Sequence, residues 1–450
     1  MTGKPTIRQA SIRRMAVSAM VVLALALGGC GITKGKTKST PTVGNRIPIL
    51  SRIEAGTKVD AGMSALEVVL PPAEANPEWA QAGGTASKSY GHLALGAAPR
   101  KAWSARIAGS TPIHRLAAAP VVGGSRLYAM DTEGKVRALD AATGREQWTQ
   151  AFRLPDSMAS VFGGGAAYSD GKVFITTGLG EVAAIDAPSG KIVWRVKPAG
   201  PLRGSPTIAF GAVYVMTQDN QIIALNEADG VQLWSESGSV AQTGVFGVAA
   251  AAAGQGTIVA GYSSGELVAY RYENGRQLWS DALARTSIAT SVSTLTDIDA
   301  DPIIERGRVY ALGQGGRLAA YELVTGQRVW ELNLAGISTP AVAGEWIFTL
   351  TDEGKLLCIA KGTGKVRWIA QMKAYRSVKK KKGPIFWTGP VLAGDRLWMG
   401  NSQGEVVSAS VVDGSVIRLA KLSAPVTLAP VVAGGVLYVL DDSGHITAFR

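Results

Sequence analysis

Histidine and cysteine are scarce in this sequence of 450 residues. The three histidines, His92, His114 and His445, are isolated from one another, so neither a zinc-ligand spacing nor a catalytic triad can be recognised. The two cysteines, Cys30 and Cys358, are also far apart, and the sequence has no adjacent cysteine pair. The residue types on which many metal enzymes and hydrolases depend are therefore not clustered along the chain.

Aromatic residues and long apolar runs are also limited. Aromatics make up 7% of the chain, which has 55 glycines and 46% hydrophobic residues. This balance is typical of many short strands joined by tight turns, and it predicts an all-β protein. The apolar run over residues 15–27 is, at about 13 residues, too short for a stable membrane span.

The N-terminus has the composition of an export signal. Four basic residues lie within residues 4–14, and the apolar run that follows ends in Leu27-Gly28-Gly29-Cys30. This ending is similar to a bacterial lipobox, whose cysteine is diacylated and becomes the first mature residue. We therefore expect residues 1–29 to be a lipoprotein signal peptide and Cys30 to be lipidated. The alternatives are a buried thiol at Cys30 or a disulfide with Cys358. The pair Arg13-Arg14 leaves twin-arginine export open beside general secretion.

The chain is basic, with a net charge of +12, and loss of the four basic signal residues leaves about +8. A protein with such a charge can bind nucleic acid, acidic lipid headgroups or an acidic protein. Export argues against nucleic acid. The one concentrated basic run, Lys379–Lys382, is either a solvated loop or a contact with lipid or lipopolysaccharide.

Residues after Cys30 are rich in Thr, Lys, Ser and Pro, with short apolar pieces at 47–50 and 66–70. This composition predicts a flexible, lipid-anchored tether over residues 30–78. The apolar pieces would be either idle or packed on the surface of the following domain.

The rest of the chain, residues 79–450, is repetitive. One unit reads Ala-Leu-Asp-Ala-Ala-Thr-Gly-Arg-Glu-Gln-Trp over residues 138–148, and residues 184–194 follow it with the same spacing. Glycine precedes tryptophan by four residues in six copies, whereas the seventh copy has Gly414 and then Arg418. The mean period of about 45 residues is that of a four-stranded propeller blade.

An eighth unit begins near residue 429 and stops at Arg450, where its last strand should start. The segment Lys101–Arg106, which contains Trp103, precedes the first repeat and has no blade of its own. The sequence therefore predicts an eight-bladed β-propeller of four-stranded antiparallel blades. Pairing of this N-terminal strand with the last blade would close the ring.

The motif Ala-x-Asp-x-x-x-Gly-x-x-x-Trp resembles the repeat shared by quinoprotein dehydrogenases and the BamB family, the propeller lipoprotein of the outer-membrane β-barrel assembly machine. The lipobox, about 420 mature residues, the eighth blade closed by the N-terminus and Trp-Ala-Gln-Ala-Gly-Gly at 79–84 resemble the BamB family. The resemblance covers residues 79–450.

The resemblance implies a non-catalytic scaffold that uses no cofactor and no metal. It implies a protein anchored by lipid to the outer membrane, facing the periplasm. It would bind the periplasmic (POTRA) domains of BamA and assist insertion of outer-membrane proteins, with unfolded outer-membrane proteins as a further partner and no nucleic acid. The alternative function is a periplasmic quinoprotein dehydrogenase or a ligand-binding propeller.

Two segments resemble the family's partner-binding loops. Leu202 and Arg203, in Leu-Arg-Gly-Ser-Pro-Thr, match residues that contact BamA, and Asp297 and Asp299 match an Asp-x-Asp pair on the same side. The resemblance implies that these four residues form one patch on exposed inter-blade loops. The competing interpretations are an ordinary loop for the first pair and a turn that caps its own amides for the second.

Two other chemistries compete with binding. Asp297, Asp299 and Asp301 have the spacing that opens a calcium loop, but Pro302 stands where that loop needs glycine and Arg308 where it needs an acid. Quinone catalysis shares the fold, yet the sequence has neither an adjacent cysteine pair nor a recognisable cluster of acids. We therefore expect no catalytic residue.

The lipobox gives the first testable prediction. In cells fed a radioactive fatty acid, the wild-type chain should be labelled, and the Cys30→Ser variant should be unlabelled and released from the membrane fraction. Equal labelling of the two chains would contradict lipidation at Cys30.

Overall fold

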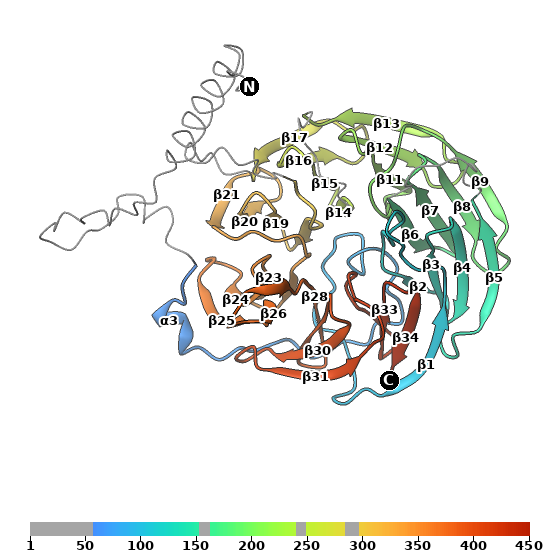
Figure 1. The fold of residues 1–450 in the computed structure, drawn as a ribbon. Helices are drawn as coiled ribbons and strands as arrows, with labels where there is room; N and C mark the ends of the chain where they lie inside the picture. Colours follow the sequence, from blue (N-terminus) through green and yellow to red (C-terminus); the bar gives the residue numbers. More distant parts are fainter. Residues whose placement is uncertain (1–56, 153–162, 240–248, 284–296) are drawn as a thin grey trace, which may run out of the picture. The chain divides into compact units, whose positions relative to one another are not determined.

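The computed structural model describes residues 57–152, 163–239, 249–283 and 297–450, which form a ring of antiparallel sheets (Figure 1). Eight four-stranded sheets are arranged around a central axis as the blades of a propeller, as the repeat predicted. In each blade the first strand lies innermost and the fourth outermost. One short helix, α3 (Ala61–Ser64), precedes the ring, and no helix in the described part of the chain is long and apolar enough to cross a bilayer.

The first four blades follow one another along the chain. Their strands are β2 (Val121–Gly123), β3 (Arg126–Met130), β4 (Lys135–Asp140) and β5 (Glu146–Ala151) in blade 1; β6 (Gly164–Ser169), β7 (Lys172–Thr177), β8 (Val182–Asp186) and β9 (Ile192–Val196) in blade 2; β10 (Thr207–Ala209), β11 (Ala212–Met216), β12 (Gln221–Asn226) and β13 (Gln232–Ser237) in blade 3; and β14 (Ala252–Gly254), β15 (Thr257–Gly261), β16 (Glu266–Arg271) and β17 (Gln277–Ala282) in blade 4.

The other four blades complete the ring. They contain β18 (Ile303–Glu305), β19 (Arg308–Gly313), β20 (Arg317–Glu322) and β21 (Arg328–Leu332) in blade 5; β22 (Ala341–Ala343), β23 (Trp346–Leu350), β24 (Lys355–Ala360) and β25 (Val366–Gln371) in blade 6; β28 (Trp387–Ala393), β29 (Arg396–Asn401), β30 (Glu405–Ser410) and β31 (Val416–Lys421) in blade 7; and β32 (Val431–Ala433), β33 (Val436–Leu440), β34 (His445–Phe449) and β1 (Lys101–Arg106) in blade 8. A separate hairpin, β26 (Tyr375–Ser377) and β27 (Lys382–Pro384), lies between blades 6 and 7.

The repeated tryptophan joins one blade to the next. The Trp279 indole in β17 donates a hydrogen bond to the Leu323 carbonyl of blade 5 at 2.8 Å, and its ring packs on Gly326. A Cβ at Gly326 would lie 2.4 Å from that ring, and its φ of 71° also favours glycine. The same contact occurs at seven of the eight junctions in the described structure, through Trp103, Trp148, Trp194, Trp234, Trp279, Trp330 and Trp368.

The ring closes through the N-terminal strand, which confirms the predicted closure. In the β1–β34 pair, Trp103 lies opposite Ala448 and Arg106 opposite His445. Trp103 then contacts Gly144 of blade 1, as the other tryptophans contact the next blade. The exception is the junction between blades 7 and 8. Blade 8 has no turn between its third and fourth strands, because the two ends of the propeller chain meet there, and Arg418 replaces the tryptophan.

Residues 57–94 form a strap that contacts the first strand of seven blades and, in blade 6, the residue that follows the first strand; Figure 1 shows the blue chain crossing the ring. First strands have a free inner edge, and in most blades backbone groups of the strap hydrogen-bond to it. The contacts, in ring order, are Trp79 with Val122, Ala80 with Tyr168, Gln81 with Ile208, Ala86 with Ala253, Ser87 with Ile304, Pro71 against Gly344, Leu93 with Leu392 and Asn76 with Gly434.

Two side chains help to fix the strap. The Gln81 amide donates to and accepts from the backbone of Ile208, both at 2.9 Å, so it acts as an extra residue of the sheet. His92 donates from Nδ1 to the Pro71 carbonyl at 2.8 Å and accepts from the Asp395 amide at Nε2. These contacts correct the predicted tether boundary, since residues 57–78 lie against the propeller. The rest of the expected tether, residues 30–56, and Cys30 are outside the described residues.

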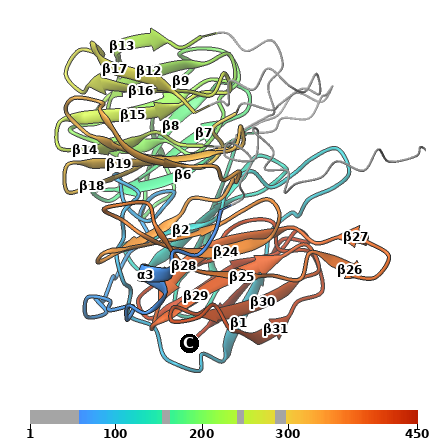
Figure 2. The same ribbon diagram turned by 90° about the vertical axis from the view of Figure 1, so that its left-hand side faces the viewer.

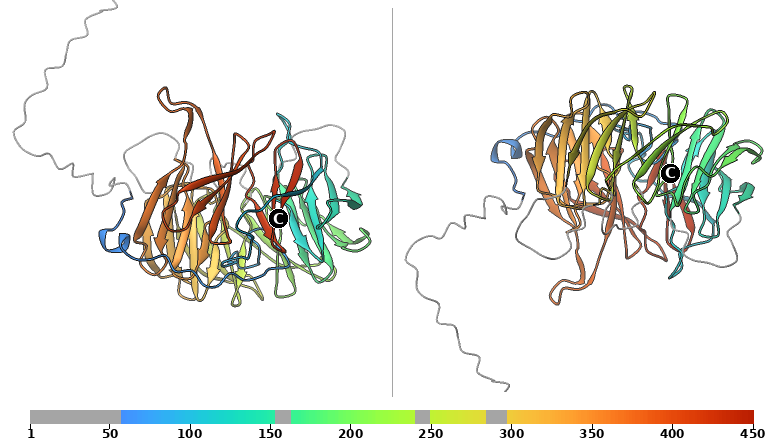
Figure 3. Two further views of the ribbon diagram at one scale, coloured as in Figure 1. Left: turned by 90° about the horizontal axis from the view of Figure 1, so that it is seen from below. Right: turned by 90° about the horizontal axis from the view of Figure 1, so that it is seen from above.

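The propeller has two different faces. The strap covers the face at which first strands end, hereafter the strap face. The opposite face carries the connections that enter each first strand, hereafter the entry face; in Figures 2 and 3 the β26–β27 hairpin projects from it, away from α3. Cys358 lies fully buried in β24.

The closure generates a stability prediction. Trp103→Ala should lower the free energy of unfolding by about 3 kcal/mol, because it removes the indole that packs blade 8 against blade 1 and leaves a cavity there. Urea unfolding followed by fluorescence measures this. Arg418→Ala, at the matching position of blade 7, is the control and should change stability by less than about 0.5 kcal/mol. Equal losses in the two variants would contradict the closing role of Trp103.

Candidate functional site

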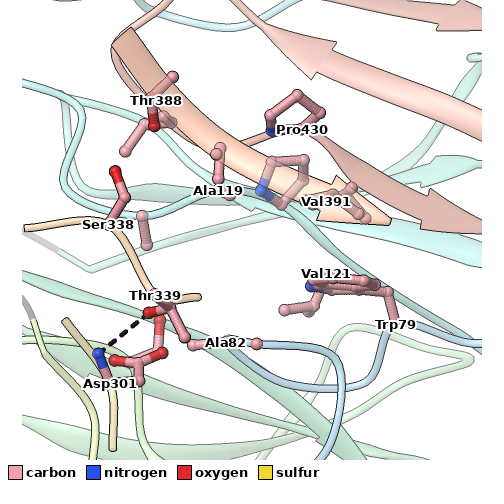
Figure 4. A pocket seen from close by; sticks show the side chains of 18 of the residues that line it. Trp79, Ala82, Ala119, Val121, Asp301, Ser338, Thr339, Thr388, Val391 and Pro430 are labelled. Carbon is pink, nitrogen blue, oxygen red and sulfur yellow. Dashed lines mark hydrogen bonds between the residues drawn. The ribbon is translucent and has the colours of Figure 1, made fainter. Parts of the chain in front are cut away.

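A cavity of about 360 Å³ lies at the propeller axis on the entry-face side of the strap. Trp79, Ala82, Gly83 and Tyr90 of the strap contribute to its lining, and the starts of first strands in six blades provide the rest. Figure 4 shows Trp79 and Ala82 from the strap opposite Thr388, Val391 and Pro430. Most of the lining is apolar, with a few polar groups from Ser205, Asp299, Asp301, Ser338, Thr339, Thr388 and Thr427. Such a composition is common in ligand and anchor pockets.

Three of the four residues singled out in the sequence, Arg203, Asp297 and Asp299, come together beside this cavity. The Arg203 guanidinium lies 2.8 Å from the Asp297 carboxylate and 3.4 Å from that of Asp299. Arg203 precedes β10 of blade 3, whereas both aspartates precede β18 of blade 5. The ion pairs therefore link two blades across the entrance to blade 4.

Backbone hydrogen bonds also fix the loops around this cluster. The Arg203 amide donates to the Met216 carbonyl at 2.8 Å, and the Gly164 amide of blade 2 donates to the Arg203 carbonyl. The Ile298 amide donates to Tyr262 of blade 4, and the Asp297 carbonyl accepts from Gln314 of blade 5. The cluster thus joins the entrances of four consecutive blades.

The burial of these residues corrects the expectation of an exposed loop patch. The side chains of Arg203 and Asp297 are only 2% and 1% exposed, and that of Asp299 is 11% exposed. Leu202 is fully buried among core residues of blades 2 and 3. Sequence alone could not show this, because charged residues are seldom buried unless they are paired, and the partners lie 94 and 96 positions away. Only Asp299 of the four lines the cavity.

Burial dominates the electrostatics of the cluster. It raises the pKa of Asp299 to about 7, and the neighbouring Asp297 charge adds to this shift, while Arg203 opposes it. Burial also raises the pKa of Asp297, against the opposing effect of Arg203. Asp299 is therefore a carboxyl group that changes charge near neutral pH at the cavity wall.

Asp301 belongs to a second buried arrangement that the sequence did not reveal. Its carboxylate accepts a hydrogen bond from the Ala250 amide at 2.7 Å, and its backbone amide donates to the Thr339 hydroxyl at 3.0 Å (Figure 4). The strap inserts Lys88, 1% exposed, whose ammonium donates to Thr207 at 3.1 Å. Burial lowers the pKa of Lys88 to about 8, and the Asp301 charge opposes that shift. Nothing in the sequence around Lys88 distinguishes it from an exposed lysine, so its burial could not be predicted.

The three aspartates do not share one ion-binding arrangement. Asp297 and Asp299 are bridged by Arg203, whereas Asp301 is held by a backbone amide. Among the described residues, no group of three or more His, Cys, Asp or Glu side chains is arranged to hold a metal ion.

The raised pKa of Asp299 predicts a pH dependence of stability. The folded state binds a proton at Asp299 more tightly than the unfolded chain, whose carboxyl has a pKa of 3.8. This contribution is complete below about pH 4 and is lost as the pH rises through about 7. Asp299→Asn cannot titrate, so its stability relative to wild type should increase from about pH 4 to pH 8.

Urea unfolding of both chains across this range measures the difference. Asp413→Asn is the control, because hydrogen bonds around Ser415 lower the pKa of Asp413, so its relative stability should not rise with pH. A relative stability of Asp299→Asn that stays flat or falls over the range would contradict the assignment.

Comparison with known proteins places this architecture in a family. The family model described as outer membrane protein assembly factor BamB matches residues 93–160, 132–370 and 372–450. The outer membrane protein assembly factor BamB of Yersinia pestis is 26% identical over 360 residues, covering 78% of this chain and 88% of that protein. The Escherichia coli protein of the same name is 27% identical over 353 residues, covering 77% and 88%.

Solved structures show the same fold. BamB from Moraxella catarrhalis superposes with a TM-score of 0.66 at 20% identity, covering 78% of this chain and 99% of that one. A quinohemoprotein alcohol dehydrogenase from Comamonas testosteroni also reaches 0.66, at 15% identity, covering 83% and 80%. The fold is thus shared by assembly factors and dehydrogenases, but the family model covers most of the sequence. The chain belongs to the BamB family of outer membrane protein assembly factors.

Proposed function

We propose that this chain is a non-catalytic scaffold of the outer-membrane β-barrel assembly machine, which binds the periplasmic domains of BamA and assists insertion of outer-membrane proteins. Family membership supports the role in assembly. The observation that carries the binding mode is the buried Arg203–Asp297–Asp299 cluster at the rim of an apolar cavity on the entry face. In this proposal Cys30 anchors the protein by lipid to the outer membrane, with the propeller in the periplasm.

The burial of the cluster changes how its residues contribute to binding. Leu202 and Arg203 are too buried for broad contact with a partner, so they act by fixing the shape of the loops around the cavity. The partner would contact the exposed rim instead, with Ile337 49% exposed and Asp299 reachable from the cavity. Preorganised loops of this kind favour affinity because little entropy is lost on binding.

This geometry also changes the expected effect of Arg203→Glu. The variant would place three acids together in a buried site, and breaking a buried ion pair costs about 3–5 kcal/mol. Loss of binding by this variant would therefore reflect a disturbed fold as well as a lost contact. The exposed rim offers a cleaner test.

The rival function is quinone-dependent catalysis, which the shared fold suggests. Quinone carboxylate cofactors are anionic, and they need cationic groups around them. No lysine, arginine or histidine is among the described residues that line the cavity, whereas Asp299 and Asp301 are. The residues present do not fit an anionic quinone, which supports the scaffold role.

The rim gives the functional prediction. Ile337→Asp should reduce co-purification of BamA at least about tenfold, because it places a charge in the apolar mouth of the cavity. Ile337 is exposed and lies outside the core, so the variant should still fold. The measurement is affinity capture of the tagged full-length chain from solubilised membranes, followed by quantification of BamA.

Ile417→Asp is the matched control, since Ile417 is 61% exposed on β31, an outer strand. It should retain wild-type capture, and both variants should unfold at the wild-type urea midpoint. If Ile337→Asp also retained wild-type capture, the cavity rim would not be the contact. If the wild-type chain captured no BamA, the proposed function itself would fail.

A further inference from the structure

The β26–β27 hairpin is the most prominent feature of the entry face that the partner site does not use. It lies in the connection from β25 to β28, and in Figures 2 and 3 it extends well beyond the neighbouring loops. Its two strands pair Tyr375 with Pro384 and Ser377 with Lys382. The run Lys379–Lys382 therefore forms the tip.

The base of the hairpin is firmly held. The Trp387 indole donates to the Lys373 carbonyl at 3.0 Å, and the Ile385 amide donates to Ala374 at 2.9 Å. Ile385 is only 6% exposed. A tip on a fixed base is presented in one place, which distinguishes it from a loosely solvated loop.

The tip is strongly basic and has no internal charge partner. Lys379–Lys382 are all exposed, and in the described part of the chain none of them forms an ion pair. No acidic residue occurs between Glu353 and Asp395, whereas Lys373 and Arg376 add to the positive charge. Val378, beside the lysines, is 65% exposed. The hairpin concentrates uncompensated positive charge above the entry face.

The hairpin and the proposed partner site border the same cavity. Thr388 and Gly389, just after the hairpin, line the cavity on one side, and Asp299 lines it on the other. A folded domain that covers the cavity would therefore reach the hairpin as well.

A membrane is the other surface that such a basic tip could contact. Each strand of the hairpin has three residues, so the hairpin with its turn would project roughly 10–15 Å. A folded domain of about 80–100 residues is roughly 30 Å across. A bilayer resting on the tip, parallel to the entry face, would leave too little space for a protein partner at the cavity. The placement of the hairpin favours a protein partner.

We propose that the Tyr375–Pro384 hairpin is a basic arm that contacts an acidic surface of the same protein that binds the entry face. This inference rests on the proposed function. The arm acts mainly on encounter, because exposed charges steer association more than they hold the final complex. Arg203 and the aspartates shape the central contact, and the lysines lie at its edge.

The test measures association of the full mature chain with full-length BamA, both in detergent, at several salt concentrations. A variant with Ser at all four positions Lys379–Lys382 should associate about tenfold more slowly at low salt and lose most of the salt dependence, with little change in dissociation. The charge-matched control replaces Lys101, Arg145, Lys191 and Arg276 with Ser. These residues are exposed at the strap-face ends of blades 8, 1, 2 and 4, and the control should behave nearly as wild type.

The outcomes separate the two proposals. If the hairpin variant and the control associate at the same rate, the arm is not a contact, although binding of BamA would still support the proposed function. If wild type does not bind at any salt concentration, the proposed function fails. A parallel sedimentation with phosphatidylglycerol vesicles tests the membrane: loss of vesicle binding by the hairpin variant, with unchanged association to BamA, would overturn the arm in favour of a lipid contact.

Discussion

Closure of the ring is the constraint on which the rest of this structure depends. Each blade is fixed to the next by a tryptophan that fills the space over a glycine turn, and the series can end only if the last blade also finds a partner. The chain solves this by taking the fourth strand of blade 8 from its own N-terminal side, so that β1 pairs with β34 and Trp103 contacts blade 1. The same solution explains Arg418: the turn that would receive a tryptophan does not exist in blade 8.

The parts of the fold that repeat could be predicted from the sequence, because their causes are local and periodic. Gly326 and Trp279 illustrate this: one needs a positive φ and no Cβ, and the other needs that empty space. The strap could not be predicted in the same way. Gln81, Lys88 and His92 each make a single, non-periodic contact with a different blade, and nothing in a polar segment distinguishes such residues from those of a tether. The apolar piece at 66–70 was the available signal, and its Val68 is buried against blade 6.

The clustering of the charged candidate residues agrees with the sequence analysis, whereas their burial does not. Resemblance selected Leu202, Arg203, Asp297 and Asp299, and the structure brings the three charged residues together. Their burial follows from tertiary structure alone: Arg203 satisfies two carboxylates, and this pairing is what permits an arginine to be 2% exposed. A buried ion network of this kind is weak evidence for stability, since desolvation offsets much of the attraction. Its value is geometric, because it holds loops from several blades in one arrangement.

The two faces of the propeller are chemically unequal because the strap occupies only one of them. On the strap face, the free edges of the first strands are already paired with residues 57–94, so little backbone remains there for another chain. On the entry-face side, Asp299, whose pKa burial raises to about 7, lines the cavity, and the basic hairpin ends just before the cavity-lining residues Thr388 and Gly389. A partner that recognises charge and apolar surface together would therefore find both on the entry face. The strap, whose Trp79, Ala82, Gly83 and Tyr90 form one wall of the cavity, therefore favours approach of a partner from the entry face.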